Sequence, residues 1–124
     1  MRKMISLSAA FVALSIGASL AQPMASDTSM GKVYTDEKGM TLYTFDKDEA
    51  NKSNCYDECA KNWPPYLAAA DAKAEGEWTL VDRTDGTKQW AYEGKPVYLW
   101  VKDTKPGDVT GDMVGEVWHA VKAD

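Results

Sequence analysis

The sequence predicts a mostly β fold: a small antiparallel sheet domain, either a sandwich or a partly open barrel, made of two related halves. Short runs of β-forming residues alternate with turn residues throughout residues 32–124. One of these turns contains Asp85-Gly86, a strong hairpin signal. A shift of 55 positions places residues 39–63 on 94–118 without a gap and with six identities, which indicates an internal repeat.

The chain begins with the features of a secretory signal peptide over residues 1–21. Two basic residues precede an apolar run over 5–20 that is short for a membrane span, and the small residues Ser19 and Ala21 predict cleavage after Ala21. We therefore expect a periplasmic or secreted protein with no transmembrane segment after cleavage. No cysteine follows the predicted cleavage site, so we expect no lipid anchor.

The charge of the mature chain limits its partners. The leader contains two of the 14 basic residues and none of the 19 acidic residues, so the remaining 12 and 19 leave a net charge of −7. A negative surface of this kind argues against nucleic acid and anionic membranes as partners.

After the leader, residues 22–31 are small, polar and aperiodic, and we expect a disordered lead-in. A single domain should follow over 32–124, with halves at about 32–76 and 77–124. Its expected strands are 32–34, 40–45, 77–81, 88–92, 95–101 and 116–121.

One short helix is expected near 54–62. Ser53 can cap its first turn, and Pro64 should end it because proline disfavours helix at the residue before it. The polar segments on either side of this helix should form loops.

Each half contains the pattern Tyr-x-(Phe/Trp/Tyr)-x-x-Asp on an expected strand. Alternation places its two aromatic residues on one face of the strand. That face could be core, or an open platform on which a planar ligand or sugar ring stacks. We expect mostly buried rings and aspartates that accept backbone N–H bonds at the strand ends. The motif residues are Tyr43, Phe45, Asp48, Tyr98, Trp100 and Asp103, and the same register pairs Trp63 with Trp118.

These motifs resemble the repeat of a bacterial family of predicted lipoproteins and secreted repeat proteins that is named for the pattern. The similarity covers about residues 31–122, including the cysteine loop that ends in Trp63-Pro-Pro65 and the closing Gly115-Glu-Val-Trp-His119. The resemblance implies an exported protein of repeat architecture and implies no reaction. The chain differs from the lipoproteins in lacking the cysteine that would accept a lipid.

The two cysteines, Cys55 and Cys59, should form a structural disulfide in an oxidising compartment. A redox-active pair is the alternative, but the Cys-x-x-Cys spacing is absent. His119 is the sole histidine. It could bind Cu(I) together with the thioether of Met113 or Met40, or it could be a partly buried strand residue.

No catalytic motif is present: the chain has no Gly-x-Ser-x-Gly, zinc-protease helix or phosphate loop. We therefore expect a non-enzyme without a cofactor, a binding or interaction module whose partner is an envelope protein or a small ligand. The alternative is a periplasmic redox protein, or one that handles copper or haem, using Cys55 and Cys59, His119 or methionine sulfur.

Overall fold

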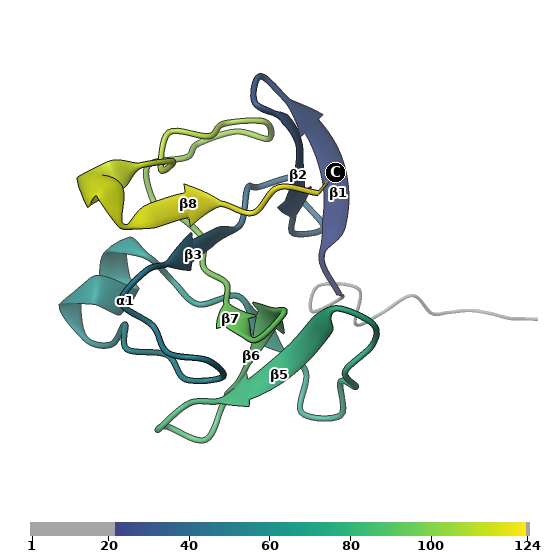
Figure 1. The fold of residues 1–124 in the computed structure, drawn as a ribbon, viewed down its shortest axis with the longest axis vertical. Helices are drawn as coiled ribbons and strands as arrows, with labels where there is room; N and C mark the ends of the chain where they lie inside the picture. The colour runs from purple at the N-terminus through teal and green to yellow at the C-terminus, as the bar shows by residue number, and fades with distance from the viewer. Residues whose placement is uncertain (1–21, 124) are drawn as a thin grey trace, which may run out of the picture.

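The computed structural model describes residues 22–123, and the predicted signal peptide, residues 1–21, lies outside that range. Short strands dominate the described chain (Figure 1). The elements, in chain order, are β1 (Met24–Thr28), β2 (Gly31–Thr35), β3 (Tyr43–Phe45), α1 (Glu58–Asn62), β4 (Leu67–Ala68), β5 (Trp78–Asp82), β6 (Lys88–Tyr92), β7 (Lys95–Pro96), the 3₁₀ turn η3 (Val114–Glu116) and β8 (Trp118–Ala120).

The strands pair in three small antiparallel sheets. β1 pairs with β2, β3 pairs with β8, and the third sheet has the order β4-β6-β5, with β7 also paired to β6. Isolated bridges, among them Val33 with Lys122 and Tyr43 with Tyr98, connect the sheets. The predicted fold class is therefore confirmed, and the described strands do not close into a barrel.

Residues 22–31 differ from the predicted disordered lead-in, because they contain β1. Every residue of β1 has a partner in β2, from Met24 opposite Thr35 to Thr28 opposite Gly31. Gly31 adopts a φ of 95°, which suits the tight turn between the strands. Three of the five residues of β1 are exposed and none is buried. The strand therefore has no buried apolar face, and its sequence shows no alternation of apolar and polar residues that would predict a strand.

The hairpin expected around Asp85-Gly86 forms between β5 and β6. Asp85 Oδ1 accepts the backbone N–H of Thr87 at 3.0 Å, and Gly86 has a φ of 90°. The two hairpins occupy matching places in the repeat, since β1–β2 opens the first half as β5–β6 opens the second. The first half therefore starts at β1 and not at residue 32.

The expected short helix is present as α1, which is shorter than the predicted 54–62. Its N-cap is Asp57, which has a φ of 56° and makes no side-chain cap bond. Ser53, which was predicted to cap the helix, instead forms a hydrogen bond with Tyr98. The two hydroxyl oxygens are 2.5 Å apart. The helix stops at Asn62, two residues before Pro64.

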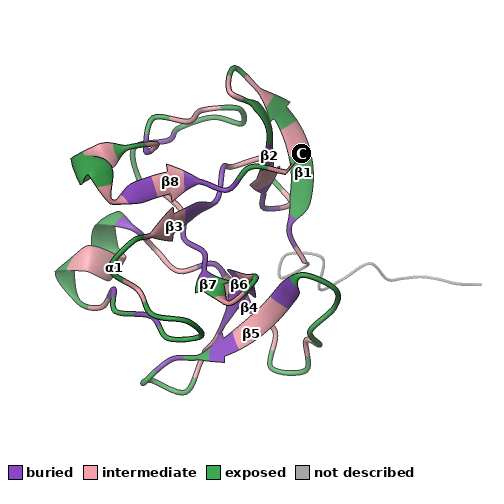
Figure 2. Cartoon of the chain, in the orientation of Figure 1, coloured by how far each residue is buried: buried purple, intermediate pink, exposed green. Residues whose placement is uncertain are grey.

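The aromatic face of β3 packs against the core: Tyr43 is fully buried, whereas Thr44 and Phe45 are half-buried (Figure 2). Tyr43 and Tyr98 are 0% exposed and belong to one hydrophobic cluster, against which Phe45 and Trp100 pack while half-buried. Leu42 and its neighbours on the other face belong to a second cluster. The burial expected for the motif rings is complete for the tyrosines and partial for the other two rings.

Candidate functional site

The two copies of the motif meet at the centre of the molecule. Tyr43 N donates to Tyr98 O and Tyr98 N donates to Tyr43 O, both at 2.9 Å. This reciprocal pair is the hydrogen-bonded pair of an antiparallel ladder. It relates the two halves by an approximate two-fold rotation.

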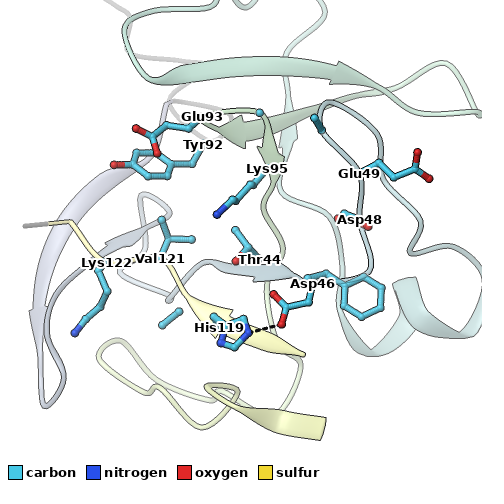
Figure 3. Close-up of a pocket in the computed structure, with 14 residues that line it drawn as sticks. Thr44, Asp46, Asp48, Glu49, Tyr92, Glu93, Lys95, His119, Val121 and Lys122 are labelled. Atoms are coloured by element: carbon cyan, nitrogen blue, oxygen red, sulfur yellow. Dashed lines mark hydrogen bonds and ion pairs between the residues drawn. The ribbon is translucent and has the colours of Figure 1, made fainter. Parts of the chain in front are cut away.

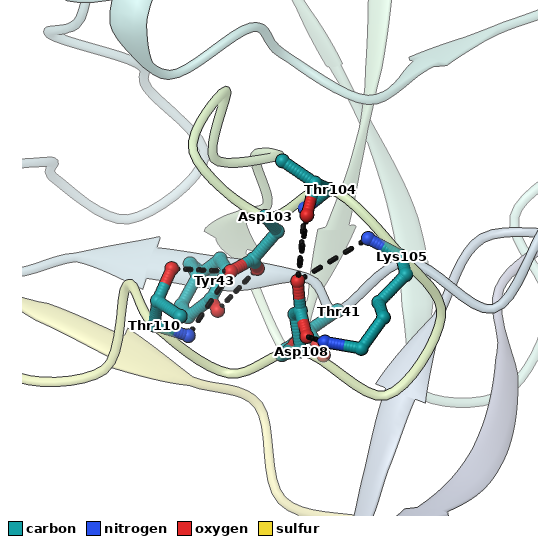
Figure 4. Close-up of polar contacts among 7 residues, drawn as sticks. All are labelled: Thr41, Tyr43, Asp103, Thr104, Lys105, Asp108 and Thr110. Atoms are coloured by element: carbon teal, nitrogen blue, oxygen red, sulfur yellow. Dashed lines mark hydrogen bonds and ion pairs between the residues drawn. The ribbon is translucent and has the colours of Figure 1, made fainter.

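Side chains of the motif are exchanged between the halves. The Tyr43 hydroxyl donates to Asp103 Oδ2, and the Tyr98 hydroxyl donates to Asp48 Oδ2, each at 2.6 Å (Figure 4 shows the first). Each tyrosine is therefore bound by the aspartate of the other copy of the motif, and the motif is complete only when both copies are present.

The second oxygen of each aspartate fixes a loop. Asp48 Oδ1 accepts the backbone N–H of Asn54 at 2.7 Å, and Asp103 Oδ1 accepts that of Thr110 at 3.0 Å. Both aspartates thus accept backbone N–H bonds as expected, from donors that lie six and seven residues along the chain. The aspartates thus close wide loops, not tight turns.

Burial decides the ionisation of this centre. It raises the pKa of both Tyr43 and Tyr98 far above the usual value for a phenol, and the hydrogen bond to a carboxyl group adds to the effect. Both hydroxyls therefore remain neutral donors at physiological pH. Burial also raises the pKa of Asp48, which bonds from Tyr98 and Asn54 partly oppose.

Sequence analysis missed a buried arginine beside this centre. Arg83 is 7% exposed, and its guanidinium donates to Ser53 Oγ at 3.1 Å, Gln89 Oε1 at 2.8 Å and the Cys55 carbonyl at 3.0 Å. It also lies 4.3 Å from the centroid of the Tyr56 ring. In sequence it is an ordinary hairpin residue, and only the fold brings its partners together.

The two paired tryptophans form the middle of a column of four stacked rings. Trp63 and Trp118 stack at 3.8 Å with an interplanar angle of 2°. Phe45 stacks on Trp118 at 4.2 Å, and Trp100 stacks on Trp63 at 3.9 Å. The column has the same approximate two-fold symmetry. At each end, a ring of the motif stacks on a tryptophan of the opposite half: Phe45 on Trp118, and Trp100 on Trp63.

Gly111 permits this packing. A Cβ at that position would lie 2.9 Å from ring atoms of both Trp63 and Tyr43, which is too close for a side chain. Its N–H donates to the Tyr43 hydroxyl at 3.1 Å. Any larger residue here would displace the aromatic centre.

The predicted disulfide between Cys55 and Cys59 is confirmed, with 5.2 Å between the two Cα atoms. Cys55 is fully buried in the cluster that contains Trp63. The bridge ties the chain before α1 to its first turn. In a chain-entropy model, a loop this short stabilises the fold by about 2 kcal/mol.

A cleft of about 470 Å³ opens beside β3, between the turn from β6 to β7 and the end of β8 (Figure 3). Its lining mixes acidic, basic and apolar side chains. The charged and titratable members are Asp46, Asp48, Glu49, Glu93, Lys95, His119 and Lys122, and the aromatic members are Phe45 and Tyr92. Phe45 is also the end ring of the column, so the aromatic centre and the cleft share a wall.

His119, a predicted metal candidate, lines the cleft, and its Nε2 lies 2.7 Å from Asp46 Oδ2. Met113, the other candidate, is exposed and is not part of the lining. Within residues 22–123, no three His, Cys, Asp or Glu side chains gather closely enough to hold a metal ion. Sequence analysis did not identify Glu93 and Lys95, because both belong to an apparently ordinary turn.

Both halves of the repeat line the cleft, and three of its ionisable residues have apolar counterparts in the repeat. Under the 55-residue shift, Asp46 corresponds to Val101, Lys95 to Met40 and His119 to Pro64. Those three counterparts are apolar. The motif positions and the paired tryptophans, by contrast, keep an aromatic or acidic residue in both halves. The halves therefore share a framework and differ in the chemistry of this surface.

Comparison with known proteins gives one family match. Residues 24–66 and 79–122 each match the same family model, described as a secreted repeat of unknown function. The first match begins at β1, in agreement with the structural boundary of the repeat. No curated protein and no solved structure matches the chain. No helix within residues 22–123 has the length and apolar character needed to cross a membrane.

Proposed function

Since this chain belongs to the family of secreted repeats of unknown function, we propose that it is an exported, non-catalytic module that binds a small ligand in the cleft beside β3. Its compartment is the periplasm or the cell exterior, after removal of residues 1–21.

One observation carries this proposal: the cleft is where the repeat loses its symmetry. Positions that hold the two halves together keep the same chemistry in both, as the pairs Tyr43 with Tyr98 and Asp48 with Asp103 illustrate. A purely structural surface has no need for ionisable groups, Asp46 and Lys95, at positions whose counterparts in the repeat are Val101 and Met40. Ionisable groups gathered in a concave surface are typical of ligand sites.

The remaining polar groups support binding over catalysis. Ser53 is the hydroxyl closest to an acid–base arrangement, but it is buried and already bonded to Tyr98 and Arg83. Of the two disulfide cysteines, Cys55 is fully buried and Cys59 is half-buried, so only the Cys59 sulfur offers access for thiol exchange. These features favour the binding module over the redox alternative.

The test is a ligand panel applied to the exported, disulfide-bonded protein. Sugars, amino acids, dipeptides and amines, together with Cu(I) and haem, are scored by melting temperature and then by calorimetry. We expect a small organic ligand to bind and the double variant Asp46→Val, Lys95→Met to abolish binding, because it replaces each charged residue by its apolar counterpart in the repeat.

Lys102→Met is the matched control, since Lys102 is exposed and lies outside the cleft. Binding that survives the double variant would contradict the proposed site. Binding of Cu(I) or haem alone, with loss in His119→Gln, would favour the metal- or haem-handling alternative.

A further inference from the structure

We propose that the cleft beside β3 takes a small zwitterion with an apolar body, in the class of amino acids and dipeptides. The inference rests on the proposed function and adds the chemistry of the ligand. Three features of the lining carry it: a lysine without an acidic partner, carboxylates with free oxygens, and apolar side chains in the same cleft.

Lys95 supplies the positive group. Its side chain extends into the space between Tyr92 and Thr44 in Figure 3, and no ion pair joins it to a carboxylate among the described residues. The other lysine of the cleft, Lys122, already donates to the Met30 carbonyl at 2.9 Å. Lys95 is therefore the lysine of the cleft that makes no side-chain hydrogen bond or ion pair to another described residue, and it can pair with a ligand carboxylate.

The turn between β6 and β7 fixes Lys95. Glu93 and Gly94 both have positive φ, 51° and 83°, and Glu93 N donates to the Glu77 carbonyl at 2.7 Å. Asn51 N donates to the Gly94 carbonyl at 2.7 Å from the opposite side. The backbone that carries the lysine is therefore held at both ends of a tight turn, so a ligand has to order the side chain of Lys95 but not its backbone.

Carboxylates around the same space supply the negative groups. The Glu93 carboxylate has no hydrogen bond or ion pair to another described residue, and Asp46 uses only Oδ2, in its contact with His119. Glu49 makes a single long contact, 3.4 Å from Asn54. These oxygens can accept the N–H groups of a ligand ammonium.

Apolar side chains line the same cleft as the charged groups. Phe45 comes from the end of the ring column, and Ala50, Ala120 and Val121 complete the wall. The volume of about 470 Å³ lies in the usual range for small-molecule sites. A ligand with an ammonium, a carboxylate and an apolar side chain matches all three features, whereas a simple cation would leave Lys95 unpaired.

The experiment uses three probes of one shape: the dipeptide alanyl-phenylalanine, its C-terminal amide and its N-acetyl derivative. Calorimetry on the exported protein should give affinity for the dipeptide at least tenfold above that for either derivative. In Lys95→Met the dipeptide should weaken about tenfold and lose its advantage over the amide. Lys102→Met should bind all three probes as the unchanged protein does.

Two results would overturn the inference and leave the proposed function intact: an amide that binds as tightly as the dipeptide, or a dipeptide unaffected by Lys95→Met. Failure of all three probes at millimolar concentration would also overturn it. The wider ligand panel then decides separately whether the cleft binds anything. A circular dichroism spectrum and a melting curve for each variant establish that it is folded.

Discussion

Tyr43 and Tyr98 each depend on a hydrogen-bond acceptor that their own copy of the motif does not provide. Because the rings are fully buried, their hydroxyls cannot turn to water instead. Loss of the Tyr43 contact would leave a buried Asp103 oxygen without its donor, which typically costs about 1–3 kcal/mol. Sequence analysis identified these residues but not their partners, since 60 and 50 residues separate donor and acceptor.

The raised pKa of the buried tyrosines predicts a loss of stability in alkali. Above about pH 10 the unfolded chain releases phenolic protons while Tyr43, Tyr66 and Tyr98 keep theirs in the fold. The native state then binds more protons, so the unfolding free energy falls as pH rises, by about 1.4 kcal/mol per pH unit for each such group. Urea unfolding between pH 8 and 11 measures this slope.

The variant Tyr43→Phe should reduce that alkaline slope by about one proton, and Tyr56→Phe, which removes an exposed hydroxyl bond, is the control. An unchanged slope in Tyr43→Phe would contradict the prediction.

At the scale of elements, the sequence predicts the turns and helix ends that depend on neighbouring residues. It does not predict strand pairing between residues that are far apart in the chain. The hairpin at Asp85-Gly86 and the end of α1 before Pro64 are set by residues that are close in sequence, so both could be predicted. β1 was missed because its strand character comes from pairing with β2 and not from its own polar residues. The sequence does not identify Lys95 as a candidate site residue, because the rest of its cleft comes from β3 and β8, which are distant in sequence.

The column of four rings gives a graded prediction for tryptophan truncation. Trp63 lies inside the column and is buried, so Trp63→Ala should lower the unfolding free energy by about 3–5 kcal/mol. Trp100 is an end ring and half-buried, and Trp100→Ala should cost about half as much. Chemical denaturation of both variants measures the difference.

Met113→Ala removes an exposed apolar side chain of the second half and serves as control for these variants. A Trp100→Ala protein of unchanged stability would show that the end ring contributes no packing energy. Its surface would then be free for ligand contact.

At the scale of the whole molecule, the repeat register predicted the architecture because framework residues recur 55 positions apart. It could not predict the exchange of side chains, since a register is the same whether tyrosine and aspartate pair within a half or between halves. The cleft was hidden for the related reason that it forms where the halves differ.

The two halves should not fold apart. Each would keep about 50 residues and lose the partner aspartate, the partner tyrosine and half of the ring column. We expect fragments 22–76 and 77–124 to lack near-ultraviolet circular dichroism alone and to regain it when mixed in equal amounts. Equal mixtures of 22–76 with a Tyr98→Phe version of the second fragment should associate more weakly. A half that unfolds cooperatively as a monomer would refute this.

The tyrosine–aspartate exchange also makes the number of motif copies in a chain matter, because the contacts are complete only when the copies form pairs. One copy of the motif offers a donor and an acceptor that it cannot join to each other, so it is the half-site of an isologous pair. Two copies on one chain form a covalently tethered version of that pair. A duplication that added one further copy would leave an unmatched tyrosine and aspartate, and only a second chain could supply their partners. Even-numbered arrays of this repeat are therefore self-sufficient, and odd-numbered arrays are built to associate.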